Sequence, residues 1–430
     1  MHCTLAIIGG GVAGLMACQQ ATLQNAFEKI LWFRADPNSL GTAYDTLCCA
    51  HLLNVPAKLM GLDPNAPEGF INWLNANQAG RWQASDFVPR MQFAAYLRAN
   101  IDRLDARVQP VPQRADSATI TNGGWRIVAG GQTFDANAII LAPGFPLVHL
   151  NDSAAKNPSV FEAWHWFNRL AKPTDSPHWG KRILVVGSGL TAVDMVLGLR
   201  DYGYTGAIDV VSSSGRWPLP HAATEPLSSI QLASLLAQLR VCSKPAAVIV
   251  ALREAATNAP WRAVLDALRP HTNDVWQSWP TALRKSIVKR AFSIWNQHRH
   301  RVPPQTLAEV LADEKTKLRR GRVSLENGNV RVNGSLQAPD QLTLFCVGAR
   351  FSAGMDANPL LDQLTRAGAL LANDLRMGLM ANTLNRIAII GACRFGELLE
   401  TVAVPELRQQ AAAAVATLVS NAGYQRRRLC

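Results

Sequence analysis

One glycine-rich turn near the start of the chain constrains the fold more than any other feature. The apolar residues 5–8 lead into the spacing Gly9-x-Gly11-x-x-Gly14, and a helical apolar period follows. In such a turn the first glycine permits a tight bend and the second lets the backbone approach a pyrophosphate, while the third lets the helix pack closely on the strand. The free N–H groups and dipole of the helix N-terminus then favour the phosphates. The pattern predicts a dinucleotide-binding unit.

The same pattern returns later in the chain. Apolar residues 183–186 lead into Gly187-x-Gly189-x-x-Ala192, and alanine is accepted at the third position. Two such turns in one chain are far more specific than one, because they indicate two dinucleotide sites. The pair predicts FAD together with NADPH or NADH, in a protein that orients hydride transfer between them.

Further buried strands and helical periods alternate along the chain, which is typical of parallel sheets in α/β folds. We therefore predict an α/β fold with two Rossmann-like dinucleotide-binding domains. The predicted strands outside the two glycine motifs cover residues 30–33, 138–142, 208–212, 342–347 and 387–390. The predicted domains are a discontinuous FAD-binding domain, residues 1–150 and 338–430, and an NAD(P)-binding domain, residues 178–337, with a helical insertion at 225–311.

The predicted insertion is helical in period and rich in tryptophan. Six apolar residues approximate a single helical stripe, which we interpret as helix core. They are Trp276, Trp279, Leu283, Ile287, Phe292 and Trp295.

Composition limits the class of protein. Hydrophobic residues make up 48% and charged residues 17%, which favours buried cores over disorder. No apolar run reaches the roughly 18 residues of a membrane span, and no export signal precedes the first strand, so we expect a cytoplasmic protein without stable membrane insertion. The eight cysteines lack metal-ligand spacing, and the histidines are dispersed, so we expect no metal site.

The net charge of +12 favours anionic ligands. It is compatible with a nucleic-acid partner, but no nucleic-acid-binding motif accompanies it. We therefore expect a small-molecule substrate and no nucleic acid. The oligomeric state stays open.

The first unit departs from the usual dinucleotide pattern at one position. An acidic residue normally ends the second strand and binds a ribose hydroxyl. Arg34 occupies that position here, and Asp36 follows two residues later. The phosphate site is unaffected, but the sequence leaves open how the adenosine ribose is held and whether FAD stays bound.

The order of motifs resembles the flavoproteins with two dinucleotide-binding domains, a group that includes glutathione-reductase-like enzymes and class B flavin monooxygenases. More narrowly, it is similar to the bacterial FAD/NAD(P)-binding protein family, which is distantly similar to the flavin N-hydroxylases. The resemblance covers nearly the whole chain. The segments that carry it are residues 41–44, 51–60, 87–97, 190–194, 298–303, 345–348 and 399–408.

The resemblance implies roles for residues outside the glycine turns. Those on the flavin side would be Tyr44, Asn54, Pro89 and Arg90, with Ala142 and Gly144 closing the first half of the FAD site. Gly348 and Gly391 would bring the last strands against the flavin. A helix starting near Glu400 and Thr401 would direct its N-terminus at the pyrimidine end, where it stabilises negative charge.

The resemblance leads to an NAD(P)H-dependent flavin oxidoreductase of monooxygenase type, similar to the N-hydroxylases, acting on a small nucleophile such as an amine. No catalytic side chain is identified, and none beyond positioning groups is needed. Two alternatives stay open: a flavin-dependent dehydrogenase or reductase without oxygen insertion, and a non-catalytic nucleotide-binding or sensing protein. A dithiol mechanism is disfavoured because Cys48 and Cys49 are adjacent in the sequence.

Two further segments have an open interpretation. Relatives of this kind tend to show two arginines after the second strand of the nicotinamide unit, where this chain has Ser213 and Ser214, with Arg216 nearby. We expect weak discrimination between NADPH and NADH, with Arg216 favouring NADPH. The basic residues 298–301 are interpreted either as an anion-binding group or as a solvated helix end.

Overall fold

The computed structural model describes residues 3–144, 157–169, 174, 176, 179, 182–347, 358–375, 377–382 and 386–426. It contains two five-stranded parallel sheets, and each glycine-rich turn follows a strand of its own sheet. The predicted fold class, with two Rossmann-like units, is confirmed.

The first sheet has the strand order β18-β7-β1-β2-β3, and every neighbouring pair is parallel. Its apolar strands are buried on both faces, as expected for a parallel sheet covered on two sides. The strands are β1 (Thr4–Ile8), β2 (Lys29–Phe33), β3 (Val108–Val111), β7 (Ala138–Leu141) and β18 (Ile387–Ile389). Because β18 comes from the far end of the chain, this unit is discontinuous.

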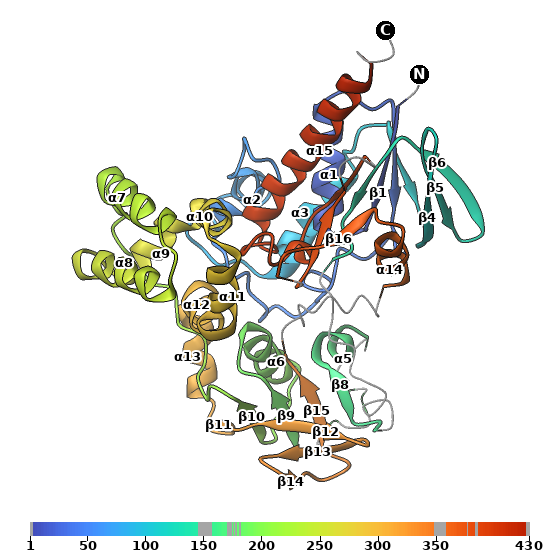
Figure 1. The fold of residues 1–430 in the computed structure, drawn as a ribbon. Helices are drawn as coiled ribbons and strands as arrows, with labels where there is room; N and C mark the ends of the chain where they lie inside the picture. The colour runs from blue at the N-terminus through green and yellow to red at the C-terminus, as the bar shows by residue number, and fades with distance from the viewer. Residues whose placement is uncertain are drawn as a thin grey trace.

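Helices and a small antiparallel sheet cover the two faces. Helix α15 (Val404–Arg426) runs alongside α1 (Val12–Leu23) (Figure 1). The other covering elements are η1 (Ala57–Leu59), α2 (Gly69–Asn77), α3 (Arg90–Ile101), β4 (Ala115–Thr121), β5 (Gly124–Ala129), β6 (Gln132–Ala136), α14 (Pro359–Arg366), β16 (Leu370–Ala372), β17 (Leu379–Ala381) and η6 (Ala392–Arg394).

The second sheet has the order β11-β10-β9-β15-β8 and is also parallel. Its strands are β8 (Val160–Glu162), β9 (Ile183–Val186), β10 (Ile208–Ser212), β11 (Thr316–Arg320) and β15 (Leu342–Phe345). Helices α5 (Ala163–Arg169), α6 (Leu190–Asp201) and α13 (Pro304–Ala312) accompany it, with an antiparallel sheet of β12 (Val323–Glu326), β13 (Asn329–Val332) and β14 (Ser335–Leu336).

Two strands of this sheet lie outside the boundaries predicted for the second domain. β8 precedes residue 178, and β15 follows residue 338, where the FAD-binding domain was expected to resume. Both strands are hydrogen-bonded into the second sheet, so the boundary at 338 is too early and the boundary at 178 too late. Partner choice between apolar strands is a long-range property, which local periodicity does not determine.

The predicted insertion is helical in the structure. Its elements are α7 (Ser229–Arg240), α8 (Pro245–Asn258), α9 (Trp261–Leu268), η3 (Arg269–His271), α10 (Thr272–Ser278), α11 (Thr281–Arg290) and α12 (Phe292–Arg299). The prediction of a single stripe from Trp276 to Trp295 is wrong, because its residues are divided among α10, α11 and α12, with Trp279 at the C-cap of α10. The interpretation as core is confirmed for the first four of them, which lie in one buried apolar cluster. Pro280 stands at the N-cap of α11, where a proline has no N–H to continue the preceding helix.

The insertion packs on the C-terminal part of the first unit. Its apolar cluster takes in Leu375 and, at its edge, Met377 and Leu399. Thus the insertion lies between β10 and β11 of the second unit in sequence but packs against the first unit in space (Figure 1). None of the described helices combines the length and hydropathy that a membrane span requires.

Candidate functional site

The three glycines of the first turn are required for different reasons. Gly9 has a φ of +134°, and a Cβ there would lie 2.0 Å from the carbonyl oxygen of Ala142. A Cβ on Gly14 would lie 2.0 Å from the carbonyl oxygen of Gly9, so close helix–strand packing requires this glycine. A Cβ on Gly11 would meet nothing closer than the Leu40 carbonyl oxygen, at 3.6 Å. Protein packing therefore does not require Gly11, and the open space beside it fits an approaching pyrophosphate.

The second turn repeats this arrangement. Gly187 has a φ of +109°, and a Cβ there would lie 2.6 Å from the carbonyl oxygen of Cys346, the residue after the neighbouring strand β15. A Cβ on Gly189 would meet no atom within 4 Å. Ala192 is fully buried where the helix packs on the sheet. Gly11 and Gly189 are the N-cap residues of α1 and α6, and neither helix has a side-chain cap. Both helix ends thus keep N–H groups available for phosphate.

Arg34 at the end of β2 turns back onto its own unit. Its guanidinium stacks 4.4 Å from the ring centroid of Trp32, and Nη2 donates to the carbonyl oxygen of Ser39 at 3.2 Å. The residue is 5% exposed, and burial lowers its pKa. Asp36, two residues later, lies in an exposed local turn, where its Oδ1 accepts the Asn38 N–H at 2.8 Å. The end of β2 itself therefore carries a buried cation where a dinucleotide unit usually has an acid.

A pocket opens at the carboxyl ends of β1, β2 and β7. Its walls include Gly9, Phe33, Ala35, Gln113 and Pro143. This edge of a parallel sheet is where open α/β folds bind ligands. The sequence motifs do not indicate Phe33, Ala35 or Gln113 as pocket residues; their position at or within two residues of a strand's carboxyl end is the signal that points to them. Next to the pocket, Ala142 packs against Gly9, and the exposed Gly144 has a φ of +82°.

The predicted flavin-side residues lie on two paired segments. Leu52 bridges Pro89, and Leu53 N–H donates to the Val88 carbonyl, so residues 51–54 run beside 88–90. Asn54 is half-buried in the first segment, and Pro89 is the N-cap of α3 in the second. Tyr44 packs 4.9 Å from Phe93 between ring centroids, and burial raises the pKa of its hydroxyl to about 12. The structure thus brings Asn54 and Pro89 together on one paired surface.

Arg90 links the two units, because its guanidinium contacts residues of both. Its Nη2 contacts the Asp194 carboxylate at 2.7 Å, and Nε donates to the Leu52 carbonyl at 3.1 Å. Asp194 lies in α6, five residues after Gly189, and its side chain is 5% exposed. Burial raises the pKa of Asp194 to about 6, although the Arg90 charge opposes the rise. The N-terminal half of α6 is therefore fixed against the segments that carry Asn54 and Pro89.

His51 adds a second link at the same place. Its Nε2 donates to the backbone carbonyl of Asp194 at 2.8 Å, and Nδ1 lies 2.7 Å from the Thr46 hydroxyl. The ring is fully buried, 4.9 Å from the ring centroid of Phe167. Burial, followed by the charge of Arg90, lowers the pKa of His51 to about 3, so the ring is neutral and its Nδ1 accepts a hydrogen bond from the Thr46 hydroxyl.

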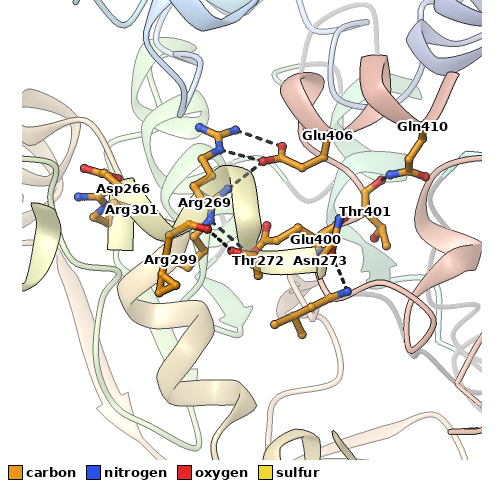
Figure 2. Close-up of polar contacts among 12 residues, drawn as sticks. Asp266, Arg269, Thr272, Asn273, Arg299, Arg301, Glu400, Thr401, Glu406 and Gln410 are labelled. Carbon is orange, nitrogen blue, oxygen red and sulfur yellow. Dashed lines mark hydrogen bonds and ion pairs between the residues drawn. The ribbon is translucent and has the colours of Figure 1, made fainter. Parts of the chain in front are cut away.

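The turn before α15 differs from the prediction. The helix begins at Val404, so Glu400 and Thr401 precede it and do not form its first turn. Asn273 accepts the N–H of Glu400 at 2.9 Å with Oδ1 and donates to the Glu400 carbonyl at 2.9 Å with Nδ2 (Figure 2). Gln410 donates to the Thr401 carbonyl and accepts the N–H of Gly391, whose φ is +91°. Side chains from the insertion and from α15 therefore position this turn.

Arginines of the insertion neutralise the buried acids around that turn. Arg269 forms a two-point contact with Glu406, at 2.8 and 3.1 Å, and Arg299 lies 3.3 Å from Glu400 and 3.4 Å from Glu406 (Figure 2). Burial alone would raise the pKa of Glu406, but the hydrogen bonds and charge of Arg269, helped by Arg299, lower it. Glu400 also accepts the indole N–H of Trp295.

This arrangement excludes one of the two interpretations of residues 298–301. Arg299 is 8% exposed and pairs with the acids of the turn, while Arg301 is 3% exposed and pairs with Asp266. The segment is therefore not a solvated helix end, and Arg299 braces the turn before α15. The sequence around Arg299 does not indicate this pairing, since both acids lie about a hundred residues further along the chain.

The remaining predicted positions lie apart from these contacts. Ser213 and Arg216 are exposed in the turn after β10. Gly348 lies outside the described residues. No group of three or more His, Cys, Asp or Glu side chains suited to a metal ion occurs in the described ranges.

The environment of His221 predicts a pH dependence of stability. Burial lowers the pKa of His221 to about 4, with the Arg301 charge adding to it, and its Nε2 donates to the Asn54 carbonyl. An unfolded histidine titrates near pH 6.5. His221 therefore stabilises the fold above pH 6.5, and this contribution is lost as the pH falls towards 4. We expect His221→Gln to flatten the fall in unfolding free energy between pH 6.5 and 5 by about 1 kcal/mol per pH unit, measured by denaturant titration. An unchanged slope would contradict the assignment.

Comparison with known proteins agrees with this geometry. Residues 6–146 match the FAD-NAD(P)-binding family model, so this part of the chain is an FAD/NAD(P)-binding domain, as predicted. No significant match is found among curated protein sequences.

Solved structures share the fold over almost the whole chain. The ornithine hydroxylase PvdA of Pseudomonas aeruginosa is 15% identical, with a TM-score of 0.61 over 97% of this chain and 99% of its own. The ornithine N-hydroxylase KtzI of Kutzneria sp. 744 is 13% identical, with a TM-score of 0.65 over 98% and 99%. The bacillithiol disulfide reductase Bdr (YpdA) of Staphylococcus aureus is 13% identical, with a TM-score of 0.57 over 97% and 98%. At these identities the likeness concerns the fold.

Proposed function

Starting from the FAD/NAD(P)-binding domain at residues 6–146, we propose that this protein is an FAD-dependent oxidoreductase reduced by NADPH or NADH. The first glycine turn holds FAD, and the second holds the nicotinamide dinucleotide. One observation carries the proposal: each turn has a glycine, Gly11 or Gly189, whose missing side chain leaves open space that protein packing does not need. The Arg90–Asp194 contact then fixes the second turn's helix against the segments that carry Asn54 and Pro89.

The reaction we propose is hydroxylation of a small amine. The ornithine hydroxylases of similar fold suggest this substrate class, and bound FAD would supply the hydride and oxygen chemistry. The protein's own residues would bind the two dinucleotides, orient them and the substrate, and shield them from water. The turn at Glu400 and Thr401 is held from the insertion by Asn273, and the neutral, buried His51 holds the backbone of α6 without exchanging a proton near neutral pH.

Optical spectra of the purified protein with added FAD test the proposal. NADPH should bleach the flavin band in the absence of oxygen, and admitting air should restore it. With ornithine or another small primary amine present, NADPH oxidation should accelerate and a hydroxylamine should accumulate. Restoration without a hydroxylated product would instead indicate a reductase. A folded protein that takes up no FAD would refute the assignment.

The adjacent cysteines are expected to be dispensable. Burial raises the pKa of the Cys48 thiol, and the nearby Asp201 carboxylate, 3.3 Å from its Sγ, raises it further. Thiol–disulfide chemistry requires the thiolate, so this environment opposes it. A Cys48→Ser, Cys49→Ser variant should retain flavin reduction by NADPH within about threefold, because a small buried thiol acts mainly as a small hydrophobe. Loss of turnover with an unchanged flavin spectrum would instead favour a dithiol mechanism.

A further inference from the structure

The turn after β10 uses its own serines to set its shape. The Ser188 hydroxyl donates to the Arg216 carbonyl at 2.7 Å and lies 2.8 Å from the Ser212 hydroxyl. Ser212 Oγ also accepts the Gly215 N–H at 3.0 Å and lies 3.3 Å from Ser214 Oγ. Ser214 in turn accepts the N–H of Arg216 at 3.3 Å. The hydroxyls of Ser188, Ser212 and Ser214 are therefore engaged within the protein and bring no charge to a ligand.

A guanidinium from the next strand occupies the space beside this turn. Arg320 is the last residue of β11 and pairs in register with Ser212, the last residue of β10. Its Nε donates to the Ser213 carbonyl at 3.2 Å, which fixes the side chain against the turn. A Cβ on Gly215 would lie 2.8 Å from the Arg320 Cβ, so Gly215 allows this close approach. Among the described residues, no acceptor is found for the two terminal nitrogens of Arg320, which can therefore bind a ligand.

The charge of Arg320 has no acidic partner among the residues that the structure describes. Its neighbour Arg319 pairs with Asp209 at 3.2 Å, and Arg331 pairs with Glu326. Neither Arg216 nor Arg320 forms an ion pair within the described parts of the chain. Two cationic side chains therefore flank a turn that stands where a Rossmann unit meets the adenosine ribose.

We propose that Arg320, together with Arg216, forms a subsite for a phosphomonoester on the adenosine ribose, and so selects NADPH over NADH. A ribose 2′-phosphate carries up to two negative charges, and a guanidinium binds phosphate through two parallel N–H groups. The charge that Ser213 and Ser214 do not supply thus comes from the adjacent strand. The inference rests on the proposed function in one respect, namely that the second glycine turn binds an adenine dinucleotide.

Isothermal titration with two nucleotide fragments tests the subsite without flavin turnover. The probes are adenosine 2′,5′-bisphosphate, which carries the 2′-phosphate, and adenosine 5′-monophosphate, which lacks it. The unmodified protein should bind the bisphosphate about ten- to a hundredfold more tightly. Arg320→Ala should remove most of this preference while leaving the affinity for the monophosphate unchanged. Arg320→Lys should retain part of the preference for the bisphosphate, because lysine keeps the positive charge but lacks the two parallel N–H groups of a guanidinium.

Arg322→Ala is the matched control, because this exposed arginine lies two residues further along and its loss changes the net charge equally. It should alter the preference by no more than about twofold, since screened surface charges act weakly. The inference is overturned if the unmodified protein binds both probes equally, or if Arg322→Ala reduces the preference as much as Arg320→Ala. Failure to bind either probe would overturn the proposed function as well.

Discussion

A Gly11→Val variant is expected to fold and to bind FAD at least about a hundredfold more weakly, a loss of roughly 3 kcal/mol. The new Cβ has room within the protein, since its nearest neighbour is the Leu40 carbonyl oxygen at 3.6 Å. The branched side chain would instead fill the space beside the N-terminus of α1, where the pyrophosphate must approach. The measurement is the dissociation constant of FAD, obtained from quenching of flavin fluorescence, with circular dichroism to confirm folding.

Two matched variants separate ligand effects from packing effects. Gly189→Val makes the same change in the second turn, so it should keep the flavin and lose NADPH-driven reduction. Gly14→Val should destabilise the fold itself, because its Cβ would lie 2.0 Å from the Gly9 carbonyl oxygen. Normal flavin content in folded Gly11→Val would refute the placement of FAD at the first turn. Loss of flavin in Gly189→Val would mean that the two sites are interchanged.

Arg90→Ala should lower the free energy of unfolding by about 3–5 kcal/mol, because it leaves the Asp194 carboxylate buried without its cation. Both side chains of this pair are less than 10% exposed, and Arg90 also donates to the Leu52 carbonyl. Denaturant titration at pH 8, above the raised pKa that Asp194 has beside Arg90, starts from an unmodified protein in which that carboxylate is ionised.

Arg126→Ala provides the control for this prediction. Arg126 contacts Asp135 at 3.0 Å in an exposed pair on the antiparallel sheet, with both side chains more than half exposed. Arg126→Ala should lower the free energy of unfolding by no more than about 1 kcal/mol, as is usual for surface ion pairs. A double variant lacking both Arg90 and Asp194 should be less destabilised than the sum of the single variants. If Arg90→Ala and Arg126→Ala cost the same, then the Arg90–Asp194 contact does not hold the two units together.

The sequence predicted those parts of the site that depend on a short, local motif. The glycine turns need a strand, a bend and a helix within about fifteen residues, so their spacing alone indicated Gly9, Gly11, Gly187 and Gly189. The same pattern identified Arg34 as a departure, but its stacking on Trp32 depends on a side-chain rotamer, which spacing does not determine.

The remaining features depend on contacts between distant segments. Arg299 lies 101 residues before Glu400 and 107 before Glu406, and local sequence does not indicate such pairings. For the same reason, the sequence does not indicate Arg320 as a ligand-binding residue. Its importance follows from the pairing of β11 with β10, which places it beside Ser212 across more than a hundred intervening residues.

The position of β18 has a consequence for synthesis of the chain on the ribosome. β7 pairs with β1 on one side and with β18 on the other, and residues 139–141 of β7 are almost completely buried. Until residues 387–389 have been translated, the first sheet keeps an open apolar edge at β7, and such edges recruit other strands. The nascent first unit therefore has to remain unaggregated, or be sheltered by a chaperone, while the second unit and the insertion are made.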